Sequence, residues 1–136
     1  MPRLILLKSG EISEQSIHKT IMHRIKLDPF LRRFVIHIPN EGKRSPRYGK
    51  LLQDMGMRRG VFDLFIMLGR HGYYGAWIEL KSRKGKLSEE QLIFQNDMRE
   101  QNYFTAVCYS IEEALETINW YCYQDKSPAM AKPLKA

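Results

Sequence analysis

The stretch from Gly60 to Lys81 constrains the fold more than any other part of the sequence. It reads GVFDLFIMLGRHGYYGAWIELK, two apolar runs that each contain charged residues, joined by a glycine-rich turn. This pattern predicts two strands connected as a hairpin. Strand side chains alternate between the two faces of a sheet, so Glu79 and Lys81 share a face. Asp63, Glu79 and Lys81 are therefore expected on buried strands, where a charge is costly unless something compensates it.

A divalent metal bound by both carboxylates is a natural compensation, because hard cations such as Mg²⁺ prefer oxygen ligands. Such a metal lowers the pKa of a bound water and neutralises charge on a phosphate, and a nearby lysine can orient that water. Asp-x(n)-Glu-x-Lys on a hairpin is the pattern of the PD-(D/E)xK nucleases. The short pattern alone favours an ordinary edge strand with a solvated ion pair, since Glu-x-Lys is common in strands.

The 136-residue length predicts a single domain, and the charge is distributed unevenly along it. Residues 1–86 contain 18 Lys/Arg and 7 Asp/Glu, whereas residues 87–136 contain 4 and 8. A basic front half suggests a polyanionic partner, first of all nucleic acid, although a basic surface can also serve solubility alone. Cys108 and Cys122 are expected to be buried thiols of a reducing compartment. The early apolar run Leu4–Leu7 is too short to span a membrane, so we expect a soluble, cytoplasmic protein.

Periodicity and capping residues predict the remaining elements. The expected helices run from Glu14 to about Leu27 after an N-cap at Ser13, over 89–100 after a Ser88/Gln91 capping box, and from Ser110 to about Tyr121. Leu92 and Met98 are expected in the core. The expected strands are Phe34–Ile38, in which His37 is more often a packed residue than a ligand, the two hairpin strands, and Tyr103–Tyr109. The order helix, strand, strand, strand, helix, strand, helix predicts an α/β domain, with strand 103–109 parallel to the strand of Glu79.

Two basic segments flank the hairpin. Residues 39–60 contain six Lys/Arg among glycines and prolines, with a helical turn at about 50–55, and suit phosphate contacts. Arg83, Lys84 and Lys86 extend the basic surface beside Lys81. The hairpin turn 69–75, with Arg70 and His71, could touch DNA or could equally have no role.

Several segments in order resemble the VRR-NUC family, a branch of the PD-(D/E)xK nucleases. They are SE at 13–14, IPNEGKRS at 38–45, MGMRRGVFDLFIML at 55–68, GYYGAWIELKSRKGKLSEEQ at 72–91 and QNYFTAVCYSIEEA at 101–114. The resemblance implies a restriction-endonuclease-like core, a central mixed β-sheet flanked by helices, with Mg²⁺ or Mn²⁺ as cofactor. It also implies DNA as substrate and, because small phage or bacterial members resemble Holliday-junction resolvases, branched DNA and a homodimer. The nuclease domain would span 13–123, between a lead-in at 1–12 and a tail at 124–136.

The resemblance also implies roles for individual residues. Asp63, Glu79 and Lys81 match the catalytic triad, with Glu14 and Gln91 as further site residues. Asp63, Glu79, the Leu80 backbone carbonyl and Glu14 would bind metal. The expected DNA contacts are Asn40, Lys43, Arg44, Ser45, Arg47, Lys50, Arg58, Arg59, Arg83, Lys84 and Lys86. Phe62 departs from the family, which has proline before the aspartate. It is tolerated if its ring enters the core, although the position of Asp63 is then less certain.

The sequence therefore predicts a metal-dependent DNA endonuclease. One alternative is a catalytically inactive, structure-specific DNA-binding module of the same fold, for which only Phe62 argues. The other is a small nucleic-acid-binding subunit whose carboxylates merely pair with lysines. The candidate dimer contacts are Leu4–Leu7, Trp120, Tyr121 and Tyr123, although core packing is the more ordinary role for Trp120.

Overall fold

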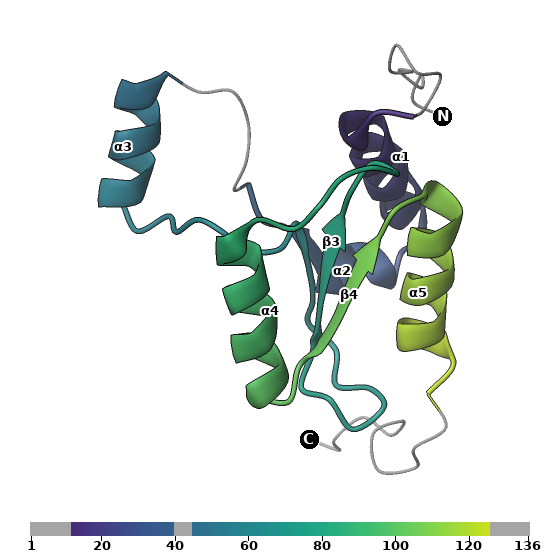
Figure 1. Ribbon diagram of the computed structural model, residues 1–136. Coiled ribbons are helices and arrows are strands. Elements are labelled where there is room, and N and C mark those ends of the chain that lie inside the picture. Colours follow the sequence, from purple (N-terminus) through teal and green to yellow (C-terminus); the bar gives the residue numbers. More distant parts are fainter. Residues whose placement is uncertain (1–11, 40–44, 126–136) are drawn as a thin grey trace.

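The predicted hairpin forms the centre of a four-stranded sheet with the order β1-β2-β3-β4 (Figure 1). The computed structural model describes residues 12–39 and 45–125. Along the chain these form α1 (Glu14–Leu27), α2 (Leu31–Phe34), β1 (Val35–His37), α3 (Pro46–Asp54), β2 (Leu64–Ile66), β3 (Ala76–Leu80), α4 (Glu89–Glu100), β4 (Phe104–Cys108) and α5 (Ile111–Tyr123).

The sheet is mixed, as the sequence predicts. β1 pairs antiparallel with β2, and β2 pairs antiparallel with β3. β4 returns after α4 to pair parallel with β3, so that Glu79 lies opposite Val107. β3 is thus a central strand with neighbours on both sides, and it carries Glu79 into the interior of the protein.

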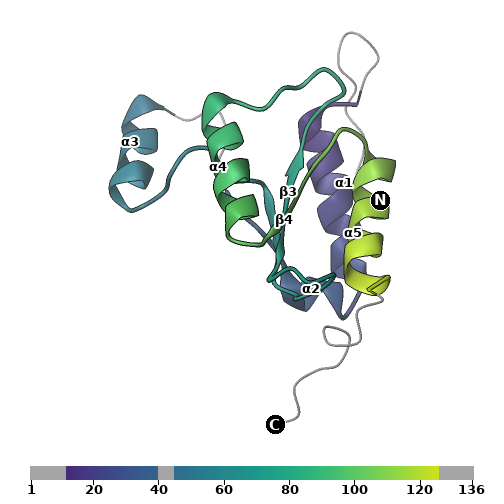
Figure 2. The same ribbon diagram turned by 60° about the horizontal axis from the view of Figure 1, so that its bottom comes forward.

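Helices cover both faces of the sheet (Figures 1 and 2). α1 and α5 lie on one face, where Ile17, Ile21 and Ile118 join Leu64 and Ile78 in the main apolar core. α4 lies on the other face. The ring of its Phe94 contacts Trp77 of β3 at a centroid distance of 4.9 Å. The α/β prediction is confirmed, and the face that holds Glu79 is the one that α4 covers.

Three serine caps fix the starts of the long helices. The Ser13, Ser88 and Ser110 hydroxyls accept hydrogen bonds from the backbone N–H groups of Ser16, Gln91 and Glu113. Each such bond satisfies an N–H that the helix itself leaves without a partner. The starts of α1, α4 and α5 are therefore where the sequence predicts them.

Other expectations were wrong in detail. The strand expected at 34–38 begins only at Val35, because Phe34 ends the short helix α2. The first hairpin strand shrinks to Leu64–Ile66, and the helical turn expected at 50–55 is a nine-residue helix, α3. Leu92 is 53% exposed and not in the core, because α4 turns Gln91 and Phe94 toward the sheet instead. His37 is exposed, although its ring contacts that of His18 at a centroid distance of 4.2 Å.

The hairpin turn packs against the end of α5. Arg70 donates from Nε to the Cys122 carbonyl oxygen at 3.2 Å, and the His71 ring stacks on Trp120 at 3.9 Å. Trp120 is 38% exposed and Tyr121 is fully buried, so these residues pack chiefly within the domain. The turn lies at the lower end of the sheet in Figure 1, whereas β3 ends at the upper end. These contacts favour a structural role for the turn.

Candidate active site

Three carboxylates from separate parts of the chain meet at the end of β3. Glu14, Asp63 and Glu79 each offer an oxygen, and these oxygens all lie within 4.8 Å of one another. Glu14 comes from the first turn of α1, Asp63 directly precedes β2, and Glu79 lies in β3. Asp63 and Glu79 are 9% and 0% exposed. The structure thus brings together the three acidic residues that the sequence singled out.

The carboxylates of Asp63 and Glu79 each accept a hydrogen bond from a backbone N–H group. Asp63 Oδ2 accepts a hydrogen bond from the Leu80 N–H at 2.9 Å, and Glu79 Oε1 accepts one from the Asp63 N–H at 3.1 Å. These two hydrogen bonds fix the positions of both carboxylates. The proposed role of the Leu80 carbonyl as a metal ligand stays a prediction.

Lys81 lies within the cluster. Its Nζ is 3.3 Å from Glu79 Oε2 and 4.0 Å from Glu14 Oε1, and its side chain is 9% exposed. A Cβ added to Gly85 would lie 3.1 Å from the Lys81 Cβ, so the turn after β3 packs directly against the lysine. The ammonium group is therefore confined beside the carboxylates.

Gln91 performs two tasks with one amide. Its Oε1 accepts from the Ser88 N–H at 2.9 Å, which completes the capping box of α4. Its Nε2 donates to Glu79 Oε2 at 2.7 Å. The sequence shows the first task, whereas the second arises because α4 begins beside the end of β3. The start of α4 is thus coupled to the carboxylate cluster.

Phe62 fits the fold without displacing Asp63. Its ring is fully buried and lies 5.3 Å from the ring of Phe94 on α4. The next residue, Asp63, still reaches the carboxylate cluster. A residue that could have argued for a damaged site is accommodated by the aromatic layer between the sheet and α4.

Sequence reasoning missed His18, one turn after Glu14 on α1. Its ring contacts His37 edge-on at 4.2 Å, and its buried Nε2 has no hydrogen-bond partner among the described residues. Burial lowers the pKa of His18 from its usual 6.5, and His37 lowers it further, whereas Asp63 acts in the opposite direction. The i, i+4 spacing from Glu14 was the signal that could have identified it.

The donor set suits a hard divalent cation. Three carboxylates converge, two of them buried, and one ammonium group lies among them. Buried carboxylates that lie this close together are costly unless positive charge compensates them, and a divalent cation at this position would supply such charge. An all-oxygen set is the kind that Mg²⁺ and Mn²⁺ prefer.

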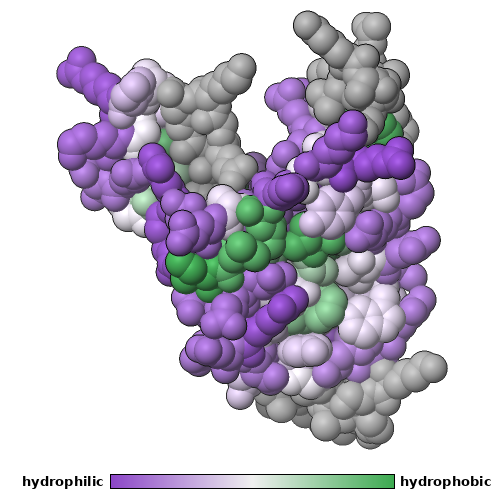
Figure 3. Space-filling model, in the orientation of Figure 1, coloured by the Kyte–Doolittle hydropathy of each residue, from purple (hydrophilic) through white to green (hydrophobic). Residues whose placement is uncertain are grey.

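The predicted DNA-binding residues lie in several segments: the undescribed part of the loop before α3, α3 itself, the segment before β2 and the turn after β3. Asn40, Lys43 and Arg44 lie outside the described residues. Arg83, Lys84 and Lys86 follow Lys81 directly and are exposed, and Arg58 and Arg59 are exposed before β2. Ser45 caps α3 by accepting a hydrogen bond from the Tyr48 N–H, while Arg47 and Lys50 lie exposed on that helix. The space-filling view shows a hollow between α3 and the rest of the protein, at the end of the sheet where β3 finishes (Figure 3).

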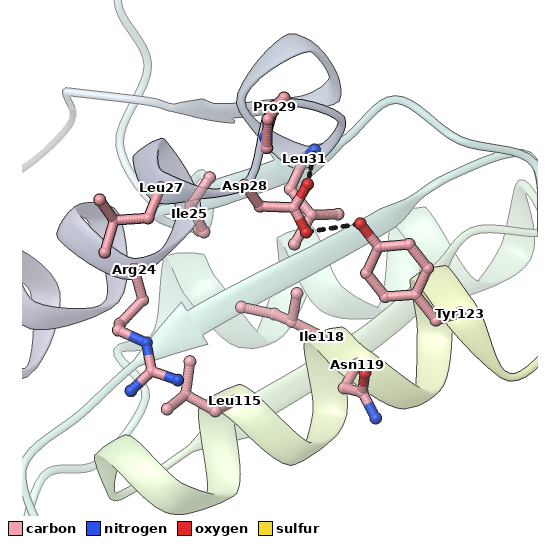
Figure 4. Close-up of a pocket in the computed structure, with 10 residues that line it drawn as sticks. All are labelled: Arg24, Ile25, Leu27, Asp28, Pro29, Leu31, Leu115, Ile118, Asn119 and Tyr123. Atoms are coloured by element: carbon pink, nitrogen blue, oxygen red, sulfur yellow. Dashed lines mark hydrogen bonds between the residues drawn. The ribbon is translucent and has the colours of Figure 1, made fainter.

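A separate pocket of about 580 Å³ lies between the end of α1 and α5 (Figure 4). Leu27, Leu115 and Ile118 supply much of its wall. Asp28 lies at its edge, where one carboxylate oxygen accepts a hydrogen bond from the Tyr123 hydroxyl at 2.6 Å. None of the carboxylates of the candidate active site lines this pocket.

Comparison with known proteins identifies a matching family from the sequence and a similar fold from the structure. The model of the VRR-NUC domain matches residues 12–112. A solved structure described as a VRR_NUC domain protein is similar at a TM-score of 0.69 and 20% identity, covering 82% of this chain and 88% of that one. It shows the shared α/β, restriction-endonuclease-like core. No protein with a curated description matches the sequence significantly. No helix in residues 12–39 and 45–125 is long and apolar enough to cross a membrane.

Proposed function

The chain belongs to the VRR-NUC family and has its nuclease-type domain, and from this premise we propose that it is a metal-dependent DNA endonuclease. The observation that carries the proposal is the convergence of Glu14, Asp63 and Glu79 within 4.8 Å, beside Lys81. The substrate would be a phosphodiester, because a carboxylate cluster with one lysine suits charge control at a phosphate rather than covalent attack.

Each site residue has a distinct task in this proposal. Asp63, Glu79 and the Leu80 carbonyl would hold Mg²⁺ or Mn²⁺, with Glu14 holding a second ion or its water. The bound metal would supply an activated water and neutralise charge on the phosphate. Lys81 would orient the attacking water, which would leave a 5′-phosphate and a 3′-hydroxyl. Gln91 is a positioning residue, since its amide holds Glu79.

The proposed DNA footprint begins beside the site. Arg83, Lys84 and Lys86 would contact phosphates on either side of the scissile bond, with Arg58 and Arg59 extending the surface, so affinity should fall steeply with salt. Asn40, Lys43, Arg44 and Ser45 are retained as proposed contacts of the same footprint. Arg47 and Lys50 lie exposed on α3.

Branched DNA and a homodimer complete the proposal. One site cuts one strand, so symmetric cleavage of a junction requires two sites related by a two-fold axis. The domain would comprise residues 13–123. An intracellular setting is supported by the free thiols of Cys108 and Cys122.

A cleavage assay tests the proposal. Labelled four-way junction, flap and linear duplex are incubated with the wild type in Mg²⁺, in Mn²⁺ or in EDTA. We expect cutting only with metal, most readily on a branched substrate. Lys81→Ala should abolish cutting, whereas Lys86→Ala, a matched loss of one nearby lysine, should weaken binding and still permit cutting. Binding without cutting under every metal would leave an inactive DNA-binding module and overturn the enzyme proposal.

A further inference from the structure

In the part of the chain that the structure describes, helix α3 has no buried face. It projects away from the sheet and the other helices in both ribbon views (Figures 1 and 2), and none of its nine residues is buried. Isolated helices shorter than about 12 residues are marginal in water, and most helices in proteins depend on packing of an apolar face. α3 therefore needs a partner.

Two apolar residues of α3, Tyr48 and Leu51, and the C-cap residue that follows the helix, Met55, form one stripe. They recur at i, i+3 and i+7, which places them on the same side of the helix. They are 52%, 51% and 75% exposed. DNA phosphates offer nothing for such a stripe to pack against, so its partner must present an apolar surface.

The outer face of α4 presents such a surface. Leu92 and Ile93 are 53% and 54% exposed, and they lie on the side of α4 opposite the buried residues Gln91 and Phe94. The space-filling view shows an apolar patch over the N-terminal end of α4 (Figure 3). Within residues 12–39 and 45–125, both the stripe on α3 and the patch on α4 are exposed.

The charges of the two surfaces are opposite. α3 contains two basic residues, Arg47 and Lys50, and one acidic residue, Asp54, which pairs with Lys50 at 3.4 Å. Residues 89–100, which are α4, contain four acidic residues and one basic residue. The acidic face of α4 would repel DNA, whereas it would attract a basic, apolar helix.

We propose that α3 of one copy docks on the outer face of α4 of a second copy, with the reciprocal contact made by the other α3. Each chain has one stripe and one patch, so a two-fold axis satisfies both contacts at once and closes the assembly as a dimer. Arg47 and Lys50 then face the partner's acidic residues instead of DNA. The inference deepens the proposed homodimer by naming its surfaces, and it does not depend on metal binding or cleavage.

A charge-swap experiment tests the contact, with the dissociation constant of the dimer measured by sedimentation. The first variant combines Arg47→Glu with Lys50→Glu. The second combines Asp97→Lys with Glu100→Lys, which keeps cations at the end of α4 where the helix dipole favours them. Each variant alone should dimerise about tenfold more weakly than the wild type, because two attractions become repulsions.

An equimolar mixture of the two variants should recover wild-type association as a heterodimer, because each altered α3 then meets an α4 of opposite charge. A mixture that fails to recover, or variants that dimerise as well as the wild type, would overturn the proposed contact. A wild type that stays monomeric would overturn the homodimer as well.

The apolar contact has its own test with a matched control. Met55→Glu should weaken dimerisation about tenfold or more, because it places a charge in the apolar stripe. Leu27→Glu makes the same change at a residue that is 66% exposed and lines the pocket of Figure 4. It should leave dimerisation unchanged. Equal effects of the two variants would overturn the assignment of the interface to α3.

Discussion

Replacing Gln91 with methionine removes the amide that donates to Glu79 while keeping the length and neutrality of the side chain. The lost bond is short, 2.7 Å, and both residues are buried, with Gln91 1% and Glu79 0% exposed. A hydrogen bond to a charged group contributes about 1.5–3 kcal/mol. Gln91→Met also removes the bond from the Ser88 N–H, half of the capping box.

Ser88→Ala is the matched control, because it removes the other half of the same capping box and leaves the bond to Glu79 in place. Loss of an N-cap costs about 1 kcal/mol. Urea unfolding in EDTA should therefore show Gln91→Met to be less stable than Ser88→Ala by about 1.5–3 kcal/mol. With metal present, Gln91→Met should cut DNA about tenfold more slowly or worse, and Ser88→Ala at the wild-type rate. Equal stability and equal activity of the two variants would refute the coupling of α4 to the carboxylate cluster.

Three further predictions follow from local geometry. Gly60→Ala should lower the free energy of unfolding, measured in urea, by at least about 2 kcal/mol, because Gly60 has φ +90° and a Cβ there would lie 2.6 Å from the Glu90 backbone. Gly49→Ala is the control: a Cβ at Gly49 would meet open space, so this change should not destabilise the protein. Burial raises the pKa of Cys108 to about 11 and that of Cys122 to about 12, so a thiol reagent at pH 8 should label neither until the protein unfolds, and labelling of the native protein would contradict this burial. The lowered pKa of His18 means that the unfolded state binds its proton more readily; stability should therefore fall as pH drops below about 6.5, and this fall should be smaller in His18→Gln.

The sequence was sufficient to predict those features of the fold that depend on residues close together in the chain. Serine caps at 13, 88 and 110 set the starts of three helices, because each hydroxyl serves a backbone N–H only three residues away. Strand alternation placed Glu79 and Lys81 on one face because it depends only on the backbone. The family resemblance then indicated which carboxylates belong together, and the fold it implied is the one observed.

The sequence was insufficient where an outcome depends on contacts between distant segments. Leu92 and Phe94 are both apolar, so the sequence does not show which of them is buried. Phe94 is buried because α4 packs against Trp77 of β3 with that side chain, whereas Leu92 is exposed. The second task of Gln91 exists because the start of α4 meets the end of β3. The start of α3 had a local signal, Ser45 before Pro46, but the glycines and prolines of residues 39–60 favoured a loop with only a helical turn.

The central claim is that Glu14, Asp63 and Glu79 form a divalent-metal site. The most direct test is anomalous diffraction from crystals soaked in Mn²⁺, with Asp63→Asn crystals as the control. We expect a Mn²⁺ peak bound by Asp63 and Glu79 in the wild type, and its loss in the variant. A wild-type map without a peak at this cluster, or with Mn²⁺ bound only elsewhere, would contradict the account of the site.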